Sequence, residues 1–322
     1  MILIDNPSHD PCWNLALEER LFQLAGLTEQ SYAMLWRNQP SVIVGRFQNT
    51  IEELDPLMAE SSGVKVVRRS TGGGAVYHDL GNLNYTLAVP IKRLDQVDFQ
   101  ALAVPVLEVL NSLGVPAKLS GRNDLTVGEL KFSGTAQMAG PKSLLYHGTL
   151  MYDVDLDRLS TILRVDPAKY QSKGVKSIRS RVTNLKSWLP AEVDLDFIDK
   201  QLALKLGPTK IQPSKDDLRE AQMIMESKYG SWEWNWGRSP DFTAVREFRF
   251  PWGRISLRFQ ITGGVVTRAK VYGDFFGGDL RAWEESLEGL AFEGQQLTDR
   301  VGELAEVIDG ASPEDLRGLL RS

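Results

Sequence analysis

The residues that could do chemistry gather first in RRSTGGGAVYHDLGN, the stretch from Arg68 to Asn82. Three consecutive glycines, Gly72 to Gly74, follow an arginine pair and lead into a strand-like segment. A P-loop or a dinucleotide fingerprint would open a helix, so neither explains the run. Glycines let a backbone approach a ligand closely and aim its amides at an anion. The stretch therefore indicates an anion-binding loop. The alternative is a glycine-rich hairpin corner beside two surface arginines.

A second stretch, SGRNDLTVGELKFSGTAQ, predicts a hairpin that turns near Gly128. Lys131 falls in the returning strand of this hairpin, shortly before Gly134. A lysine that points inward from a strand needs an anionic partner, because burying its charge alone is costly. Simple alternation along the strand would instead point Lys131 outward. Asp124, in the same way, fits a turn at the entry to a strand as well as it fits a functional site.

Composition limits the other kinds of site. The chain has one cysteine, Cys12, and three scattered histidines, His9, His78 and His147, so it offers neither an intramolecular disulfide nor a Cys/His zinc cluster. A metal, if there is one, would be a hard cation accompanying phosphate. The net charge of -5 argues against a general nucleic-acid binder. No apolar run approaches the ~18 residues of a membrane span and no signal peptide is recognisable, so we expect a cytoplasmic protein without nucleic-acid or membrane partners.

Short β-rich runs alternate with helical patterns along the chain. Asp10 and Pro11 form an N-cap and first-turn pair, and leucines then recur at helical spacing. The strands follow one another as if paired with their neighbours, with helices on one face. This order favours an α+β fold with a mixed, largely antiparallel sheet over a doubly wound one. The expected helices cover residues 11–25, 99–113, 194–206 and 215–229, and the expected strands cover 32–37, 41–45, 64–69, 82–90 and 143–155.

The length of 322 residues suggests two domains, since single cores usually stop growing near ~250 residues. A Gly/Ser/Pro-rich segment at 237–240 is a plausible boundary. After it the sequence predicts three strands with a turn at Gly263-Gly264, and then helices. We expect a catalytic domain over 1–241 and a small accessory domain over 247–322. Just before the boundary, alternating tryptophans indicate one face of a strand that packs in the core or at the domain interface: Trp232, Trp234 and Trp236.

Several motifs in order resemble those of the bacterial lipoate-protein ligase A family: RRSTGGGAVYHDLGN, GRNDLTVGELKFSG, HGTL at 147–150 and KSIRSRVTNL at 176–185. The likeness extends from NLALEE near the start to GSWEWNWG before the linker. It implies a catalytic domain with the fold of biotin protein ligases and class II aminoacyl-tRNA synthetases, plus a small α+β domain. The implied reaction joins lipoate and Mg-ATP into lipoyl-AMP and pyrophosphate. A lysine of an acceptor lipoyl domain then takes the lipoyl group and releases AMP.

The resemblance also implies roles for individual residues. Lys131 would be the catalytic residue, bridging the lipoate carboxyl and the α-phosphate of ATP. Arg69 would hold ATP phosphates, and Asp124 would contact Mg²⁺. The backbone of four consecutive residues would bind the nucleotide: Gly74, Ala75, Val76 and Tyr77.

The acyl chain and the adenylate have their own implied contacts. Gly72 and Gly73 would line the path of the lipoyl chain, and His78 would stand near its carboxyl end. Arg179 and Arg181 lie in a loop, residues 175–183, that the family uses to cover the adenylate.

The implied partners are lipoate, with octanoate also accepted, and two kinds of acceptor. These acceptors are the lipoyl domains of 2-oxoacid dehydrogenase acyltransferase subunits and the glycine-cleavage H-protein. We expect a monomer. One alternative is a lipoyl or octanoyl transferase that works through a cysteine thioester, but Cys12 lies far in sequence from the glycine loop. Another is a non-catalytic lipoyl-domain binding protein, which would need neither Lys131 nor the arginine pair.

Overall fold

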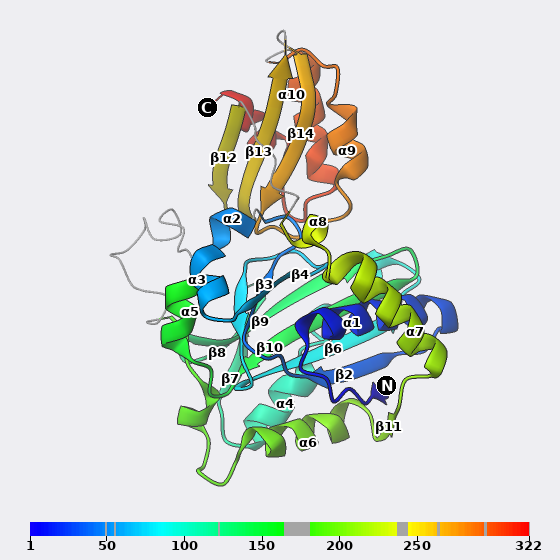
Figure 1. Ribbon diagram of the computed structural model, residues 1–322, viewed down its shortest axis with the longest axis vertical. Helices are drawn as coiled ribbons and strands as arrows, with labels where there is room; N and C mark the ends of the chain where they lie inside the picture. Colours follow the sequence, from blue (N-terminus) through cyan, green and yellow to red (C-terminus); the bar gives the residue numbers. More distant parts are fainter. Residues whose placement is uncertain are drawn as a thin grey trace.

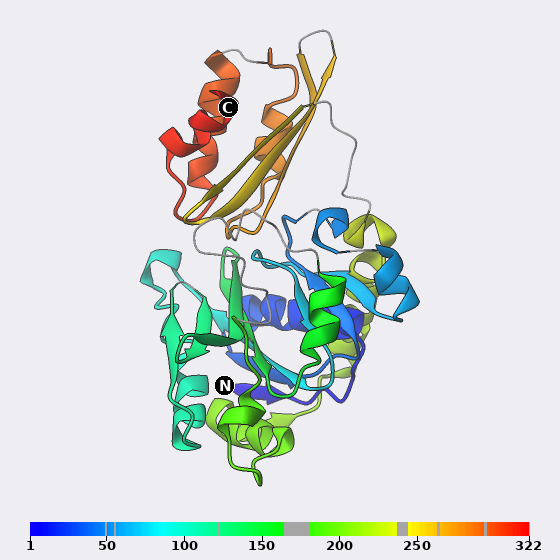
Figure 2. The ribbon, with the colours of Figure 1, turned by 90° about the vertical axis from the view of Figure 1, so that its left-hand side faces the viewer.

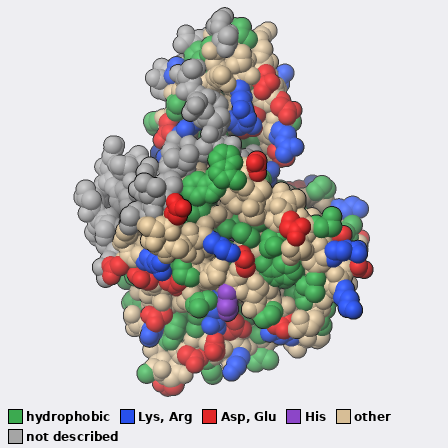
Figure 3. Space-filling model, in the orientation of Figure 1, with side chains coloured by type: hydrophobic (Ala, Val, Ile, Leu, Met, Phe, Trp, Pro, Cys, Tyr) green, Lys and Arg blue, Asp and Glu red, His purple; other side chains and the backbone are tan. Residues whose placement is uncertain are grey.

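A computed structural model of the chain describes residues 1–48, 50–54, 56–121, 123–163, 181–236, 244–262, 265–292 and 295–321. Figures 1 and 2 show two parts stacked along the long axis: an N-terminal part up to residue 236 and a C-terminal part from residue 244. No helix among these residues is long and apolar enough to cross a membrane. On the face in Figure 3, lysines and arginines are interspersed with aspartates and glutamates, so this face does not present a field of one sign.

The N-terminal part is built on a mixed sheet in the order β11-β1-β2-β6-β10-β9-β8-β7. β1 pairs in parallel with β2 and β11, and the pairs from β2 to β7 are antiparallel. A smaller sheet, β4-β3-β5, carries the glycine loop between two of its strands. The expected mixed, largely antiparallel α+β fold is confirmed. The bounds are β1 Ile2–Ile4, β2 Tyr32–Trp36, β3 Ser41–Val44, β4 Lys65–Arg68, β5 Val76–His78, β6 Asn82–Pro90, β7 Ala117–Ser120, β8 Asp124–Val127, β9 Leu130–Ala139, β10 Ser143–Met151 and β11 Thr209–Ile211.

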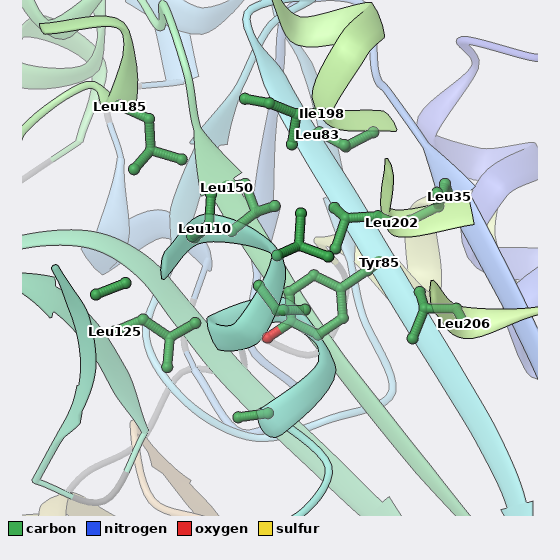
Figure 4. Close-up of a cluster of buried hydrophobic side chains, with 14 of the residues drawn as sticks. Leu35, Leu83, Tyr85, Leu110, Leu125, Leu150, Leu185, Ile198, Leu202 and Leu206 are labelled. Atoms are coloured by element: carbon green, nitrogen blue, oxygen red, sulfur yellow. The ribbon is translucent and has the colours of Figure 1, made fainter. Parts of the chain in front are cut away.

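Helices cover both faces of the large sheet, so the expectation of helices on one face is wrong. α1 (Pro11–Thr28) and α7 (Lys215–Ile224) lie on one face, and α4 (Val104–Ser112) and α6 (Leu195–Leu206) lie on the other. The reason is visible in β6, which buries both of its sides. Leu83 and Tyr85 join the apolar core under α4 and α6 (Figure 4), and Thr86 faces α1. A strand buried on both faces needs cover on both.

Most predicted elements occur close to their expected positions. α1 begins where the capping pair predicts, because the Asp10 carboxylate accepts a hydrogen bond from the backbone N–H of Cys12 and Pro11 occupies the first turn. α4 begins at Val104, five residues later than expected. The prediction of a strand at the tryptophans is wrong, because Trp232–Asn235 is the short helix α8. The Ser231 hydroxyl accepts a hydrogen bond from the N–H of Trp234 and so caps the start of this helix. Alternation over so few residues does not separate a strand from one turn of helix.

The remaining helical elements are short. In the N-terminal part they are α2 Thr50–Glu53, α3 Pro56–Ser61, η1 Leu94–Gln96, α5 Leu156–Ile162, η4 Leu185–Trp188 and the π-helical turn η5 Met225–Tyr229 that extends α7. In the C-terminal part they are α9 Arg281–Ser286, α10 Gln295–Glu303, η6 Leu304–Glu306, α11 Pro313–Gly318 and η7 Leu319–Arg321.

The C-terminal part has its own antiparallel sheet, formed by β12 (Ala244–Phe250), β13 (Gly253–Thr262) and β14 (Val265–Gly273). Three strands followed by helices were expected, and this is confirmed. The expected turn at Gly263-Gly264 and the boundary at 237–240 lie outside the described residues. Helices α9 to α11 complete a core of the part's own, which, among the described residues, also includes Phe47 of the N-terminal part. This ring stacks on Phe275 with centroids 4.8 Å apart.

Backbone hydrogen bonds join the two parts. The N–H of Gly273 donates to the carbonyl of Phe47, and the N–H of Gly73 donates to the carbonyl of Phe275 at 3.3 Å. The second bond places the end of the C-terminal sheet directly against the glycine loop. The C-terminal part therefore contacts the segment that the sequence singles out for ligand binding.

Candidate active site

A cavity of about 490 Å³ opens beside the glycine loop. Both sheets of the N-terminal part contribute to its walls, and the C-terminal part closes one side. Its lining is apolar toward α1 and β2 and polar toward the β8–β9 hairpin. The residues that line it include Leu15, Trp36, Ile43, Arg69, Gly73, Gly74, Ala75, Val76, His78, Asn84, Asp124, Lys131, Gly134, His147, Thr149, Arg249, Trp252, Asp274 and Phe276.

Lys131 points into this cavity and pairs with Asp124, with 2.7 Å between Nζ and Oδ1. Both side chains are about a third exposed, at 36% each. The register of β8 against β9 shifts next to Thr126, the residue opposite Lys131. Such an irregularity re-aims a side chain. Sequence alternation alone would have left Lys131 on the outside.

Two neighbours support the position of Lys131. A Cβ on Gly134 would lie 3.1 Å from the lysine Nζ, so a glycine leaves room for the ammonium. The Lys131 backbone also pairs with the segment around Val182: its N–H donates to the carbonyl of Arg181 at 2.8 Å, and its carbonyl accepts from the N–H of Thr183 at 2.9 Å. The end of the expected adenylate loop is therefore attached to the lysine strand.

The three glycines of the loop have different surroundings. A Cβ on Gly72 would overlap the carbonyl oxygen of Phe275, so this glycine is required by the C-terminal part. Gly73 has φ of 92°, which favours glycine, and a Cβ there would meet the Arg69 guanidinium at 3.0 Å. A Cβ on Gly74 would meet nothing within 4 Å, although Gly74 lines the cavity. Gly74 is thus the position where the fold itself leaves the space open.

Arg69 is buried and holds the glycine loop in shape. Its guanidinium donates to the carbonyl of Ile43 at 3.1 Å, to those of Gly72 and Gly74 at 2.6 and 2.9 Å, and to the Thr71 hydroxyl at 2.9 Å. Burial lowers the pKa of Arg69 to about 10, which still leaves it charged at neutral pH. Four of its five N–H groups are used by the loop and its neighbouring strand.

Arg68 points away from the cavity, unlike Arg69. Its guanidinium is fully buried and donates to the carbonyls of Gly45, Arg46, Gln48 and Trp234. It therefore connects the segment after β3 to α8 and does not line the cavity. The arginine pair of the motif divides into one residue beside the site and one residue that joins distant segments.

His147 and Glu18 form a buried polar contact that the sequence reading missed. His147 Nδ1 lies 2.8 Å from Glu18 Oε1, and its Nε2 lies 2.9 Å from the Thr71 hydroxyl. Glu18 is 2% exposed and also accepts from the Thr86 hydroxyl at 2.6 Å. The sequence did contain an indication of this contact: Glu18 falls on the apolar side of α1, next to Leu17 and Leu21, where a carboxylate would be buried. A buried carboxylate needs partners, and a histidine in a nearby motif could have supplied one.

His78 is buried in the cavity wall, with Nδ1 3.1 Å from the amide nitrogen of Asn38. Burial, together with the nearby charge of Arg69, lowers the pKa of His78 to about 3. The ring is therefore neutral at physiological pH.

The structure brings most of the expected site residues to one cavity, but not all of them. Lys131, Asp124, Arg69, His78 and the run Gly73–Val76 line it. Tyr77 does not line the cavity; its side chain is buried in the core with Val42 and Val44. Gly72 packs on Phe275. Arg181 reaches Lys131 through its backbone, and Arg179 lies outside the described residues.

Neither a metal cluster nor a reactive thiol is found among the described residues. These residues contain no group of three or more His, Cys, Asp or Glu side chains that could hold a metal ion. Cys12 is half-buried in α1, and burial raises the pKa of its thiol to about 11. A thiol with that pKa is almost entirely protonated at neutral pH and is a poor nucleophile. This finding argues against the thioester transferase alternative.

Two family models match the chain. The lipoyl protein ligase A/B catalytic domain matches residues 10–207, and the bacterial lipoate protein ligase C-terminus matches residues 239–320. Lipoate-protein ligase 1 of Staphylococcus aureus is 39% identical over 306 residues, covering 93% of this chain and 92% of its own. Lipoate-protein ligase LplJ of Bacillus subtilis is 39% identical over 308 residues, covering 93% of each chain.

Solved structures share the fold. LipL1 of P. falciparum, in complex with lipoate, has a TM-score of 0.82 at 23% identity and covers 100% of this chain and 99% of that one. The bipartite lipoate protein ligase of Thermoplasma acidophilum, studied with its E2 lipoyl domain, has a TM-score of 0.67 at 28% identity and covers 76% and 98%. A lipoate-protein ligase A bound with ATP has a TM-score of 0.63 at 25% identity and covers 73% and 97%.

A cavity that gathers a lysine, an aspartate and a glycine loop on this fold fits an acyl-group ligase. The matches over nearly the whole chain are more specific: the chain belongs to the lipoate-protein ligase family. It is an enzyme that ligates lipoate to proteins, and the resemblance found in its sequence motifs is confirmed.

Proposed function

We propose how this ligase carries out ATP-dependent lipoylation with the residues around the cavity. In the first step a lipoate carboxylate oxygen attacks the α-phosphorus of ATP, the bond to the β-phosphate oxygen breaks, and pyrophosphate leaves. In the second step the ε-amine of an acceptor lysine attacks the acyl carbon. AMP leaves with the acyl C–O bond electrons, and the amine loses a proton to give an amide. The observation that supports this best is the position of Lys131 on the cavity wall.

Lys131 is the catalytic residue of this proposal. Two anions approach each other in the first step, so the site needs a positive charge held in advance between them. The ammonium of Lys131 faces the cavity and is held by Asp124, the carboxylate 2.7 Å away. The incoming carboxylate and phosphate oxygens provide further partners for its three N–H donors.

Asp124 also suits the Mg²⁺ that accompanies ATP. Mg²⁺ is usually bound through one or two protein carboxylates together with phosphate oxygens and water. Asp124 supplies one carboxylate on the same wall as Lys131, so the residues fit the ion. Bound there, Mg²⁺ would neutralise phosphate charge. Asp124 would then be shared between the ion and the lysine.

The glycine loop and the segment after it would bind the nucleotide. Gly74, Ala75 and Val76 line the cavity, and their backbone would make these contacts. The hydrogen bonds of Arg69 suggest that this residue shapes the loop and adds its positive field, rather than gripping phosphates with a free guanidinium. Tyr77 contributes backbone alone. Arg179 and Arg181 remain candidates for covering the adenylate.

The apolar end of the cavity would take the acyl chain. Leu15, Trp36, Ile43 and Val76 line it, and Gly73 borders the entrance. We expect octanoate to be accepted less well than lipoate. The two substrates share most of the chain, and an apolar pocket separates such analogues by about 1–3 kcal/mol. A competition assay with both acids measures this ratio. Complete rejection of octanoate would contradict the apolar description of the pocket.

The acceptors of the proposal are folded lipoyl domains, of acyltransferase subunits or of the glycine-cleavage H-protein. The Thermoplasma relative studied with its E2 lipoyl domain supports this class of partner. The proposal also includes a monomeric, cytoplasmic enzyme, with a catalytic domain over 1–241 and an accessory domain over 247–322. Phe47 in the C-terminal core suggests that the accessory domain is held by the catalytic one.

The test is ATP-pyrophosphate exchange by the full chain, with and without lipoate. Exchange requires a reversible adenylation step, so we expect labelled ATP when lipoate is present and none when it is absent. Mass spectrometry of an apo lipoyl domain then follows the transfer. Exchange that is independent of lipoate, or transfer without consumption of ATP, would contradict the proposed function.

A further inference from the structure

His78 lines the cavity, and one of its ring nitrogens has no hydrogen-bond partner. The residue is 3% exposed, and its buried Nε2 has no partner among the described residues. A buried polar atom without a partner is rare and costly unless something else satisfies it. The question is whether this nitrogen donates or accepts, because the two tautomers of a neutral imidazole differ in that respect.

A chain of amide contacts that begins at Asn6 leads through Asn14 and Asn38 to His78. The indole N–H of Trp13 can only donate, and so can the backbone N–H of Ser8. Both lie 3.3 Å from Asn6 Oδ1. This contact identifies that atom as the oxygen. The other atom of the amide, Asn6 Nδ2, then donates to Asn14 Oδ1 at 2.8 Å.

The side-chain amide of Asn14 is oriented in the same way, with its nitrogen as a donor to the next residue. Its Nδ2 lies near two backbone carbonyls, which can only accept: that of Ser8 at 3.2 Å and that of Arg37 at 3.0 Å. The same nitrogen lies 2.9 Å from Asn38 Oδ1. Asn14 and Asn38 are both completely buried. With its oxygen toward Asn14, Asn38 must turn its nitrogen toward His78.

We propose that Asn14 and Asn38 hold His78 in the Nε2–H tautomer, and that this N–H donates to the acyl oxygen of the substrate. The Asn38 amide nitrogen always donates, so the His78 Nδ1 that faces it at 3.1 Å must accept. The ring proton of the neutral imidazole is then on Nε2. Asn14 and Asn38 touch no substrate and act as positioning residues, whereas His78 touches it.

The charge around His78 supports a neutral donor. Burial and the neighbouring Arg69 and His147 lower the pKa of its ring to about 3, so an imidazolium is not an alternative at neutral pH. A neutral imidazole N–H donates a hydrogen bond without transferring its proton to the substrate. It can hold the lipoate carboxylate, then the adenylate carbonyl, and then the oxyanion that develops when the acceptor amine attacks.

The acyl oxygen is the acceptor that the surroundings favour, given the proposed function. His78 packs edge-on against Trp36, with ring centroids 6.3 Å apart, and shares a strand face with Val76. These side chains belong to the apolar end that would hold the acyl chain. Phosphates would lie with Lys131 at the polar end. A dithiolane sulfur is a much weaker acceptor than an oxygen.

The tautomer is tested by NMR on the full chain labelled with ¹⁵N-histidine. The chain has three histidines, and His78→Gln identifies the His78 signals by their loss. We expect one neutral histidine with its proton on Nε2, unchanged between pH 5 and pH 8. In Asn38→Leu we expect a mixture of tautomers, whereas Asn111→Leu, a control far from the cavity, leaves the spectrum unchanged. A proton on Nδ1 or an imidazolium in the wild type would overturn the assignment.

The role of the N–H is tested by kinetics. His78→Leu should lower exchange and transfer by about 10²–10³, the usual loss on removing one oxyanion donor. His78→Gln, whose side-chain amide places an N–H near the position of Nε2, should retain at least ten times the activity of His78→Leu. Asn38→Leu should lower kcat about tenfold with little change in KM for ATP. Equal activity of the Gln and Leu variants would overturn the donor role.

Two further outcomes separate the parts of the proposal. If His78→Leu impairs the use of lipoate but not of octanoate, His78 contacts the dithiolane and the acyl-oxygen assignment is wrong. If the wild type shows no exchange, the proposed function and the acyl-oxygen assignment fail together. The NMR spectrum needs no turnover, so it decides the tautomer in either case.

Discussion

The two faces of the large sheet bury different kinds of side chain, and β6 contributes to both. Leu83, Tyr85 and Leu87 point to the α4–α6 face, where the core is mostly apolar; Figure 4 shows Leu83 and Tyr85 in this core. Asn84 and Thr86 point to the α1 face, where the buried side chains include polar and charged groups. Most side chains of the first face are held by packing. The second has side chains that each need a specific partner.

This difference separates stability from chemistry. An apolar core stabilises in proportion to the area that it removes from water, and no single contact is indispensable. A buried carboxylate such as Glu18 is tolerated because the Thr86 hydroxyl and the His147 ring both meet it. Losing one partner leaves a charge unsatisfied. We therefore expect substitutions on the α4–α6 face to affect mainly the free energy of unfolding, and substitutions of cavity-lining residues on the α1 face to affect activity as well.

The largest effect is expected for Lys131→Ala, on the face that carries the cavity. Removing a charge that is positioned between two anions should lower the rate of pyrophosphate exchange by about 10²–10³ or more. Lys131 is a third exposed, so the melting temperature should change little. Lys131→Arg should not restore activity, because a planar guanidinium does not replace a compact ammonium. Exchange above a tenth of the wild-type rate would remove Lys131 from the catalytic role.

Leu83→Ala and Asn84→Ala test the two faces with adjacent residues of one strand. Leu83 is completely buried in the apolar core, and its truncation should cost about 2–5 kcal/mol of stability with KM unchanged. Asn84 lines the cavity, so its truncation should raise KM for lipoate or ATP several-fold with a smaller loss of stability. Urea unfolding and steady-state kinetics on both variants measure this. The same pattern of effects from both would mean that the faces are not specialised.

The buried His78 should make the stability of the protein sensitive to acid. The pKa of His78 falls from 6.5 in the unfolded chain to about 3 in the folded one, so between these values the unfolded chain binds a proton that the folded protein does not. Stability should therefore fall as the pH drops below about 6.5, by up to about 1.4 kcal/mol per pH unit from this group. His78→Gln should flatten the dependence between pH 7 and pH 5. Identical slopes for variant and wild type would contradict it.

The smallest effect is expected from a pair in the glycine loop. Gly72→Ala would place a methyl group against the carbonyl of Phe275, so it should loosen the C-terminal part and speed its release by limited proteolysis. Gly74→Ala has free space on the protein side, so proteolysis should be unchanged. Any effect of Gly74→Ala should appear in KM for ATP. If both variants loosen the C-terminal part equally, the division of roles within the loop is wrong.

Local patterns carried much of the prediction of the fold. The Asp10-Pro11 pair marks the start of α1, and the Asn82–Pro90 strand has the predicted bounds. These features depend on capping, period and turn residues, which act over a few positions. The placement of helices on both faces depends instead on which strands pair with which, and the tryptophan segment was too short for its period to decide. Both predictions failed for those reasons.

For the site, the sequence by itself determined the residues, and the tertiary structure decided what each one does. The motifs identified Lys131, the glycines and His78 before any contact was known, because their types and order are local properties of the chain. The hydrogen bonds of Arg69 to the glycine loop, the pairing of His147 with Glu18, and the fit of Gly72 against Phe275 join positions 2 to 203 residues apart. Their geometry depends on the whole path of the chain. A buried polar group is satisfied by whatever the fold brings to it, and no spacing in the sequence specifies that.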